Sequence, residues 1–196
     1  MVLPKLTRDF YDRDTLTVAR ELLGKYLVRM WNGAPLAGRI TETEAYIGRV
    51  DKACHAYDYK RTARTETLFA RPGTVYIYLI YGMYHCLNFV TEAEGEPCAV
   101  LIRGLEAADG AEQIARNRYG TGLAGLSAYQ KKNFLNGPGK LCKGLALTRA
   151  QNGLDLTGDE LFVWDDGGTP PLFHTRKRIG IDYAEEAVDF PWRFYV

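Results

Sequence analysis

Serine, histidine and long apolar runs are scarce in this chain of 196 residues. Its one serine, Ser127, is followed by Ala128 and Tyr129 and so lacks the second glycine of a nucleophile elbow. The chain has no Walker loop and no dinucleotide-binding fingerprint. No apolar run is long enough to cross a bilayer, and the amino terminus lacks the pattern of a signal peptide. The sequence therefore favours an intracellular protein without a membrane span, a serine nucleophile or a nucleotide cofactor.

Cysteine is also sparse, and the four residues show no Cys-x-x-Cys spacing: Cys54, Cys86, Cys98 and Cys142. Free thiols in a reducing compartment are the simplest interpretation. His55 and His85 each adjoin a cysteine, which suggests a zinc site. Adjacent strand residues point to opposite faces, however, so both members of such a pair could rarely bind one metal. We expect no metal site and no cofactor.

The net charge is only +1, but the basic residues are unevenly distributed. No acidic residue occurs between Gln113 and Leu154, whereas seven basic residues do: Arg116, Arg118, Lys131, Lys132, Lys140, Lys143 and Arg149. A second group comprises Lys60, Arg61, Arg64 and Arg71. A single lysine is more often a solvated loop charge, but an acid-free stretch of this length favours a surface that faces phosphates. The glycine-rich turn from Asn136 to Lys143 would open a helix whose first N–H groups attract phosphate, which makes Lys140 a candidate contact, although an ordinary tight turn fits equally well.

A composition of 46% hydrophobic and 25% charged residues fits one globular domain over residues 1–196. Asp14 and Gly24 would begin and end a helix, and a further helix is expected at Glu112–Arg118. Expected strands are Lys25–Trp31, Leu36–Tyr46, Cys98–Arg103, Glu160–Trp164, Arg178–Ile181 and Arg193–Val196. Residues 49–71 should form a long loop or an irregular helix. We expect an α+β fold with a curved, mostly antiparallel sheet, peripheral helices and a protruding β-hairpin.

The hairpin is expected within Gly73–Val90, where aromatic and β-branched residues dominate and Gly82 interrupts the run. Alternation would direct Val75, Ile77 and Leu79 into a core and would direct Tyr76 and Tyr78 to the opposite face. Tyr81 and Met83 would then lie at the tip. A buried hairpin needs no large side chains at an exposed tip, whereas a protein that wedges into stacked bases does.

A second motif, Ile40–Gly48, places Glu42, Glu44 and Tyr46 on one side of an expected strand. A carboxylate beside a ring that can stack is the minimum equipment for hydrolysing a flat aromatic substrate. The ordinary alternative is that Glu44 is a solvent-facing carboxylate on an edge strand.

Together these motifs resemble the alkyladenine (3-methyladenine) DNA glycosylase family, whose members excise damaged purines. The resemblance extends from about Leu16 to Val196 and is most specific at Glu42–Tyr46, Gly73–Tyr84, Gly137–Cys142 and Arg193–Val196. It implies a monofunctional base-excision-repair enzyme, acting as a monomer on double-stranded DNA that contains damaged purines. Such an enzyme would lie in the cytoplasm at the nucleoid of a bacterium or in the nucleus of a eukaryote.

The resemblance also implies roles for individual residues. Glu44 would activate a water that attacks C1′ of a flipped nucleotide, and Arg103 and the main-chain carbonyl of Ile179 would help to hold this water. The extruded base would be held by Tyr46, His55 and Tyr78, while Asn88 would limit access by purines with a 2-amino group. Tyr81, with Met83 beside it, would fill the gap left in the duplex.

Each of these residues also has a structural alternative. Tyr46, Tyr76 and Tyr78 could be core residues with satisfied hydroxyls, which is the preferred interpretation for Tyr76. His55 could be a surface histidine, and Arg103 could pair with Glu106. At the level of function, the alternatives are a non-catalytic binder of distorted DNA and a hydrolase of free nucleosides.

The proposed role of Asn88 makes a geometric prediction. A regular two-residue loop at Gly82-Met83 would pair Tyr78 with Leu87 and place Asn88 on the opposite face. Asn88 and Tyr78 share a face only if the loop has an odd length or a bulge intervenes. The functional interpretation therefore predicts an irregular hairpin.

Overall fold

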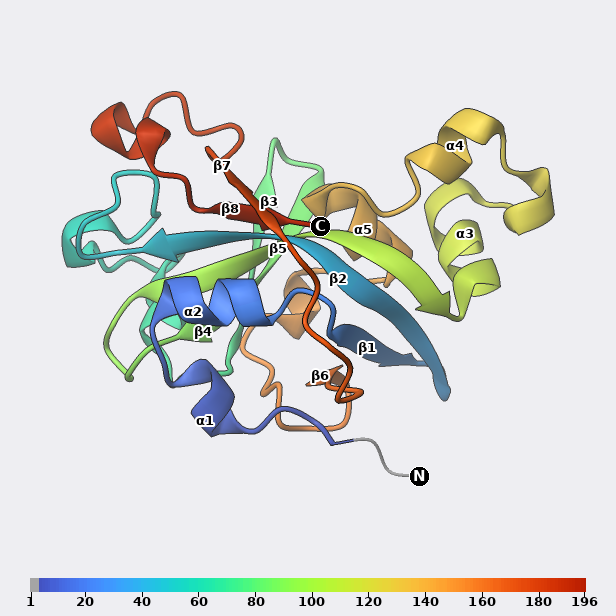
Figure 1. Cartoon of the computed structure of the whole chain (residues 1–196), viewed down its shortest axis with the longest axis horizontal. Helices are drawn as coiled ribbons and strands as arrows, with labels where there is room; N and C mark the ends of the chain where they lie inside the picture. Colours follow the sequence, from blue (N-terminus) through green and yellow to red (C-terminus); the bar gives the residue numbers. More distant parts are fainter. Residues whose placement is uncertain (1–3) are drawn as a thin grey trace.

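The computed structural model describes residues 4–196, and one twisted antiparallel sheet organises them (Figure 1). Six strands follow the order β3-β4-β5-β2-β1-β6, β8 pairs with β2, and β7 pairs with β8. The strands are β1 (Tyr26–Trp31), β2 (Ala34–Ile47), β3 (Val75–Ile80), β4 (Tyr84–Thr91), β5 (Cys98–Asp109), β6 (Leu161–Trp164), β7 (His174–Arg176) and β8 (Arg193–Tyr195). The α+β fold class with an antiparallel sheet is confirmed.

Within residues 4–196, five short α-helices lie around this sheet. They are α1 (Arg8–Tyr11), α2 (Thr15–Glu21), α3 (Ala111–Tyr119), α4 (Ala128–Lys132) and α5 (Pro138–Gly144). The same part of the chain has five 3-10 helices, at Tyr57–Tyr59, Glu66–Phe69, Leu123–Gly125, Arg149–Gln151 and Glu185–Asp189. Asp14 caps α2, since its Oδ1 accepts the Thr17 N–H at 2.8 Å. Figure 1 shows α3 and α4 together at one end of the molecule.

One face of the sheet packs in the main hydrophobic core, and the other face lines a cavity. Val75, Ile77, Leu87 and Phe89 point to one face and join the main hydrophobic core with residues of α2 and α5. Alternate residues of the same strands point to the other face and line a cavity, among them Tyr76. Alternation along each strand thus separates the stabilising face of the sheet from the face available for chemistry.

Strand β2 is the centre of the fold because three strands pair with it. Its first half pairs with β1, residues 42–44 pair with β8, and most of its length pairs with β5. The β2–β5 ladder contains register shifts on both sides of Glu42. As a result, no residue of β2 pairs with Arg103 on β5. Gly104 permits the close approach there, since a Cβ would lie 2.9 Å from the Thr41 hydroxyl. Bulges of this kind redirect side chains, and this one directs Arg103 toward β2.

The hairpin of β3 and β4 has the predicted irregularity. Ile80 pairs with Tyr84, which leaves a three-residue loop of Tyr81, Gly82 and Met83. Tyr76 therefore pairs with Asn88, and Asn88 shares a face with Tyr78. Tyr81 and Gly82 both have positive φ, 53° and 67°. The prediction of an odd loop is confirmed.

Two local predictions are wrong. Residues 178–181 form no strand, because Gly180 turns the backbone at φ 76° and the Ile179 N–H donates to a side chain instead of a ladder. Leu79 does not enter the core and is 36% exposed, because β5 pairs with β4 only from Asn88 to Thr91 and leaves the hairpin tip uncovered. The sequence analysis also missed α1, α4 and β7.

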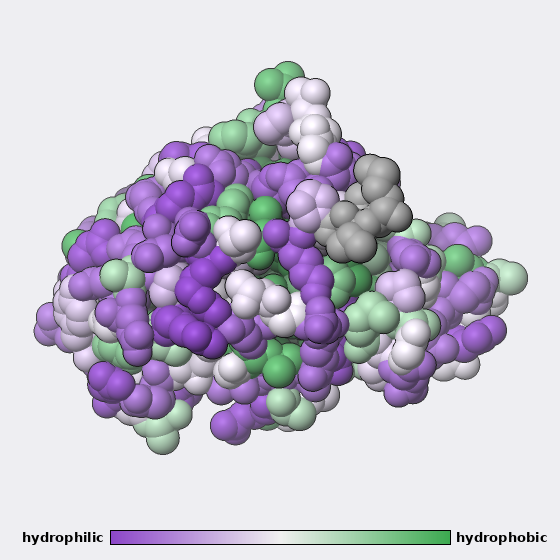
Figure 2. All heavy atoms as spheres, turned by 90° about the horizontal axis from the view of Figure 1, so that it is seen from below, coloured by the Kyte–Doolittle hydropathy of each residue, from purple (hydrophilic) through white to green (hydrophobic). Residues whose placement is uncertain are grey.

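The surface on the side of α1 and β6 is mostly hydrophilic, with hydrophobic residues in small separate groups (Figure 2). Large exposed side chains are found instead at the hairpin tip, where Tyr81, Met83 and Tyr84 are 79%, 65% and 50% exposed. Within residues 4–196, no helix is long and apolar enough to cross a membrane. All four cysteines are buried free thiols.

A pair of leucine substitutions tests the assignment of the core face. Leu87 is fully buried in the main core and Leu172 is 97% exposed. Leu87→Ala should lower the free energy of unfolding by about 2–5 kcal/mol, because it leaves a cavity in the core. Leu172→Ala should change it by less than about 0.5 kcal/mol. Urea denaturation followed by fluorescence measures both, and equal effects would contradict the assignment.

Candidate active site

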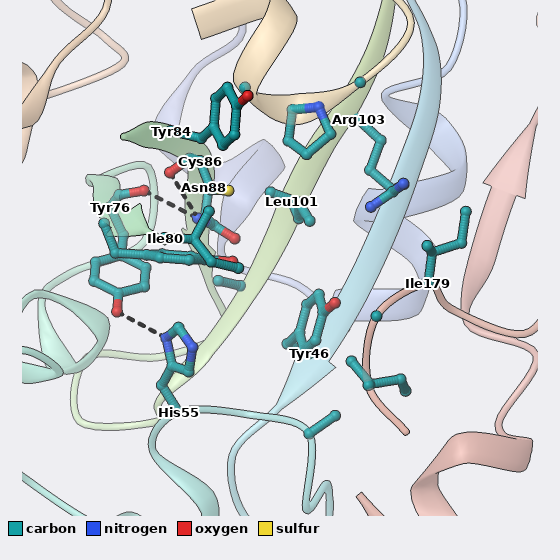
Figure 3. A pocket seen from close by; sticks show the side chains of 18 of the residues that line it. Tyr46, His55, Tyr76, Ile80, Tyr84, Cys86, Asn88, Leu101, Arg103 and Ile179 are labelled. Carbon is teal, nitrogen blue, oxygen red and sulfur yellow. Dashed lines mark hydrogen bonds between the residues drawn. The ribbon is translucent and has the colours of Figure 1, made fainter. Parts of the chain in front are cut away.

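A cavity of about 790 Å³ opens on the face of the sheet opposite the main core (Figure 3). Eight of the ten predicted site residues line it: Tyr46, His55, Tyr78, Tyr81, Asn88, Arg103, Lys140 and Ile179. Glu44 and Met83 do not. A volume of this size suits one flat organic group with several polar contacts.

Glu44 lies directly behind the cavity wall with none of its surface exposed. Its Oε1 accepts the Ile179 N–H at 2.9 Å and lies 3.4 Å from Arg103 Nε. Its Oε2 accepts the hydroxyl of Tyr46 at 2.8 Å. The alternative of a solvent-facing carboxylate on an edge strand is therefore wrong, because β2 has neighbours on both sides of Glu44.

Burial dominates the electrostatics of this carboxylate. It raises the pKa of Glu44 above its ordinary value, although Arg103, the Tyr46 hydroxyl and the Ile179 N–H act in the opposite direction. Burial and the neighbouring Glu44 together raise the pKa of Tyr46 well above the usual range, so the phenol stays protonated and donates. A carboxylate with a raised pKa is a better proton acceptor, which suits a general base.

Arg103 faces two carboxylates rather than one. Its Nε donates to Glu42 Oε1 at 3.2 Å, and the same oxygen accepts Arg193 Nη1 at 2.9 Å. The alternative pairing of Arg103 with Glu106 is wrong. The guanidinium therefore lies at the edge of the cavity, fixed by Glu42 and directed at Glu44.

Three aromatic rings form one wall of the cavity. His55 and Tyr78 are arranged edge to face with ring centroids 4.5 Å apart, and Tyr76 lies 5.5 Å from Tyr78. Figure 3 shows His55 and Tyr76 on one side of the cavity and Tyr46 on the other. A flat group that enters between them would meet aromatic surface on both of its faces.

His55 is neutral in this wall. Its Nδ1 lies 3.1 Å from the Tyr76 hydroxyl, and its Nε2 lies 3.4 Å from Arg64 Nη2. Burial, together with the charge of Arg64, lowers the pKa of His55 to about 4. The alternative of a surface histidine is wrong, and Tyr76 combines burial with a hydrogen bond to a cavity residue.

Asn88 is buried at the base of the same wall. Its amide nitrogen donates to the main-chain carbonyls of Tyr76 and Cys86, each at 3.2 Å (Figure 3). These bonds fix the orientation of the amide. At the rim, the Lys140 ammonium donates to Asn136 Oδ1 at 2.8 Å and to Asn133 Oδ1 at 3.1 Å, with no carboxylate partner among the described residues.

A buried ion pair behind the site was not predicted from the sequence. Arg178 and Asp51 lie 127 residues apart in the chain, and both side chains are fully buried. Asp51 Oδ1 accepts Arg178 Nη2 at 2.8 Å, and a second hydrogen bond joins Arg178 Nη1 to Oδ2. No local spacing could have indicated a pair so distant in sequence.

Comparison with known proteins identifies the family and several relatives of this chain. The family model described as methylpurine-DNA glycosylase matches residues 9–196. The chain belongs to this family. One relative, from Clostridium perfringens strain SM101, is 57% identical over 195 residues, which cover 98% of this chain and 95% of that protein. A relative from Alkaliphilus oremlandii is 52% identical over 192 residues, covering 98% and 95% of the two chains.

A third relative, from Clostridioides difficile strain 630, is 44% identical over 201 residues, covering 97% of this chain and all of that protein. The names of all three assign them provisionally as 3-methyladenine DNA glycosylases. The expected family is confirmed, and with it the expectation of a DNA glycosylase, a hydrolase of N-glycosyl bonds. The roles of the individual residues stay predictions.

The raised pKa of Glu44 predicts a pH-dependent stability. The folded protein binds the Glu44 proton more tightly than the unfolded chain does, so this group favours folding below pH ~4.3. That contribution is lost as the pH rises through the folded pKa. Glu44→Gln should therefore gain stability relative to wild type over this pH range and then level off. Its amide can still accept from Ile179 and donate to Tyr46. Urea denaturation at a series of pH values measures the difference.

The matched control is Glu66→Gln. Arg61 donates to Glu66 on the surface and lowers the pKa of that carboxyl, so the control should show a small change of opposite sign. A Glu44→Gln variant whose stability follows wild type in parallel at every pH would contradict the raised pKa.

Proposed function

We propose that this glycosylase flips a damaged purine out of duplex DNA and hydrolyses its N-glycosidic bond with a water activated by Glu44. The observation that carries the proposal is the position of the Glu44 carboxylate behind a cavity with aromatic surface on two sides. A carboxylate at the sugar and rings around the base are the two requirements for hydrolysing a nucleoside inside a protein.

The chemistry follows the logic of inverting glycosidases. The bond between C1′ and the purine nitrogen breaks with development of positive charge on the sugar, and the water oxygen bonds to C1′ as Glu44 takes its proton. The electron pair of the broken bond leaves with the purine. Because Glu44 itself has no exposed surface, the water would be held where Arg103 and Ile179 border the cavity. None of the proposed contact residues at the sugar is a lysine, so an abasic site without strand cleavage is the expected product.

The cavity wall supports binding of the purine itself. Extrusion of a base costs a few kcal/mol, and less for a damaged base that pairs or stacks poorly. Stacking on aromatic side chains contributes about 1–3 kcal/mol per base, which offsets much of that cost. Alkylated purines that carry positive charge are also attracted to the faces of Tyr46 and Tyr78. Asn88 would discriminate against a 2-amino group, since its amide is held by main-chain carbonyls.

The charge of the surface supports DNA rather than a free nucleoside as the substrate. None of the seven basic residues of the acid-free stretch forms an ion pair within the described chain. Two of them, Arg118 and Lys140, line the cavity. Cations without carboxylate partners beside a base-sized cavity are suited to phosphates that flank an extruded nucleotide.

Single-turnover excision tests the role of Glu44. The substrates are duplexes that carry an alkylated purine, hypoxanthine or ethenoadenine. We expect wild type to release the free base and leave an alkali-labile site, and Glu44→Gln to be slower by about 10²–10⁴-fold. Glu44 must be ionised to act as a base, and its pKa is raised. As the pH is lowered, the wild-type rate should therefore begin to fall at a higher pH than it would with an ordinary carboxyl group. Excision that is unaffected by Glu44→Gln would remove Glu44 as the base.

The same experiment separates the alternatives. Tight binding to an abasic-site analogue without release of any base would indicate a non-catalytic damage-binding protein. Equal rates on free alkylated nucleosides and on duplex DNA would indicate a nucleoside hydrolase.

The exposed tip of the hairpin predicts a second result. Tyr81, 79% exposed and in the left-handed region at φ 53°, would fill the gap in the duplex. Tyr81→Ala should weaken binding to an abasic-site duplex by about 1–3 kcal/mol, which is the value of one stacked ring. Tyr81→Phe keeps the ring and should restore the affinity. Fluorescence anisotropy measures both, and an unchanged affinity of Tyr81→Ala would exclude the wedge.

A further inference from the structure

The segment that supplies Ile179 to Glu44 has no regular structure of its own. Residues 177–181 belong to no helix or strand, and Ile179 is 51% exposed. Gly180 at φ 76° turns the chain immediately after it. Even so, the Ile179 N–H lies 2.9 Å from Glu44 Oε1. Some other interaction must hold this segment in place against the carboxylate.

The neighbouring residue, Arg178, provides that interaction. Its guanidinium bonds to both carboxylate oxygens of Asp51 and to two main-chain carbonyls, of Ala45 at 2.9 Å and of Ala187 at 3.1 Å. It also lies over two rings, 4.7 Å from the centroid of Tyr46 and 5.1 Å from that of Trp192. One side chain thus joins the loop after β2, the residue next to Glu44, and the carboxyl-terminal segment.

The energetics of this pair make a purely stabilising role a weak explanation. Two buried charges lose their hydration, and a well-packed apolar pair would often stabilise a fold equally well. Two contacts of Arg178, with the Ala45 carbonyl and the Tyr46 ring, lie on the strand that carries Glu44. Ala45 lies between Glu44 and Tyr46 in sequence, and Tyr46 donates to Glu44. Arg178 therefore holds both residues that donate to Glu44: Ile179, which follows it in the chain, and Tyr46, whose ring it lies over.

We propose that Arg178, held by Asp51, is a positioning residue that fixes the Ile179 amide and the Tyr46 ring on the Glu44 carboxylate and so orients the general base. The proposal rests on the proposed function of Glu44. It assigns no contact with the substrate to Arg178, which acts only through its neighbours.

The charge environment of Glu44 defines what the test must separate. Six groups from five segments surround it: Glu42 and Tyr46 on β2, Tyr78 on β3, Cys86 on β4, Arg103 on β5, and Arg178. Arg178→Lys keeps a positive charge but cannot make the forked contacts with Asp51, Ala45 and Ala187. Arg178→Gln also removes the charge. Their comparison separates orientation from electrostatics.

The test is a double-mutant cycle by single-turnover excision at saturating enzyme. Arg178→Lys should slow excision of an alkylated purine by about 100-fold, as expected when a reacting group is misplaced. In the Glu44→Gln background the same change should have less than about a twofold effect, because the base it orients is missing. Affinity for an abasic-site duplex should stay within about twofold of wild type. An equal loss in both backgrounds would overturn the proposal.

The matched control is Arg29→Lys. Arg29 is a buried arginine on β1, and its Nη1 lies 2.6 Å from Glu160 Oε1. Arg29→Lys should lower the melting temperature as Arg178→Lys does, but it should leave the excision rate unchanged. Should Arg178→Lys fail to fold, Asp51→Asn provides a milder variant that still accepts one hydrogen bond from Arg178. Its excision rate should fall between those of wild type and Arg178→Lys, and a wild-type rate in a folded Asp51→Asn protein would overturn the proposal.

A readout without DNA keeps this proposal separate from the proposed function. Carbon NMR titration of the Glu44 carboxyl, identified by its absence in Glu44→Gln, should show a higher pKa in Arg178→Lys, which keeps the positive charge but no longer fixes the Ile179 N–H and the Tyr46 hydroxyl that lower this pKa. The pKa should rise further in Arg178→Gln, which also loses the charge. An unchanged titration in Arg178→Lys would overturn the positioning role. If the titration shifts but wild type releases no base, the proposed function fails while the contact of Arg178 with the Glu44 site stands.

Discussion

The burial of one ionisable carboxylate is the constraint on which this structure depends. Glu44 lies on the most connected strand of the sheet, where water cannot solvate its charge. The fold supplies substitutes for that water from three places: the Tyr46 hydroxyl two residues along β2, the guanidinium of Arg103 on β5, and the N–H of Ile179 135 residues away. The bulge in the β2–β5 ladder and the path of the carboxyl-terminal segment bring the last two of these groups to the carboxylate.

The aromatic wall obeys a different constraint, which is the absence of charge. His55 is kept neutral by burial and by Arg64, and the phenol of Tyr78 is kept protonated by burial. Under the proposed function, a wall of uncharged rings would accept both neutral and cationic purines, since neither would have to displace a counter-ion. The charged residues that line the cavity are Arg103, Arg118 and Lys140, and Arg64 lies 5.4 Å from the centroid of the Tyr78 ring.

The sequence predicted the elements whose signals are local. The alternation of Glu42, Glu44 and Tyr46 and the Asp14 cap follow from spacing over a few residues, and the structure has both. The odd hairpin loop was predicted from the role that the family resemblance implies for Asn88, and the structure has it as well. The partners of buried charges could not be found in this way. Nothing near Arg178 in sequence indicates Asp51, and the pattern around it resembles a strand because its apolar neighbours suit one. The bulge at Arg103 is equally hidden, because it depends on how two distant strands match in register.

The hairpin also restricts where this chain can change in length. Pairing of β4 with β3 and β5 sets the alternation in which Asn88 faces the cavity and Phe89 faces the core. A residue gained or lost at the exposed tip would only lengthen or shorten the loop, since it leaves these pairs in place. A residue gained or lost within β3 or β4 would turn part of that strand to the opposite face. Homologous hairpins that keep this pocket should therefore differ in length at the tip and not within the two strands.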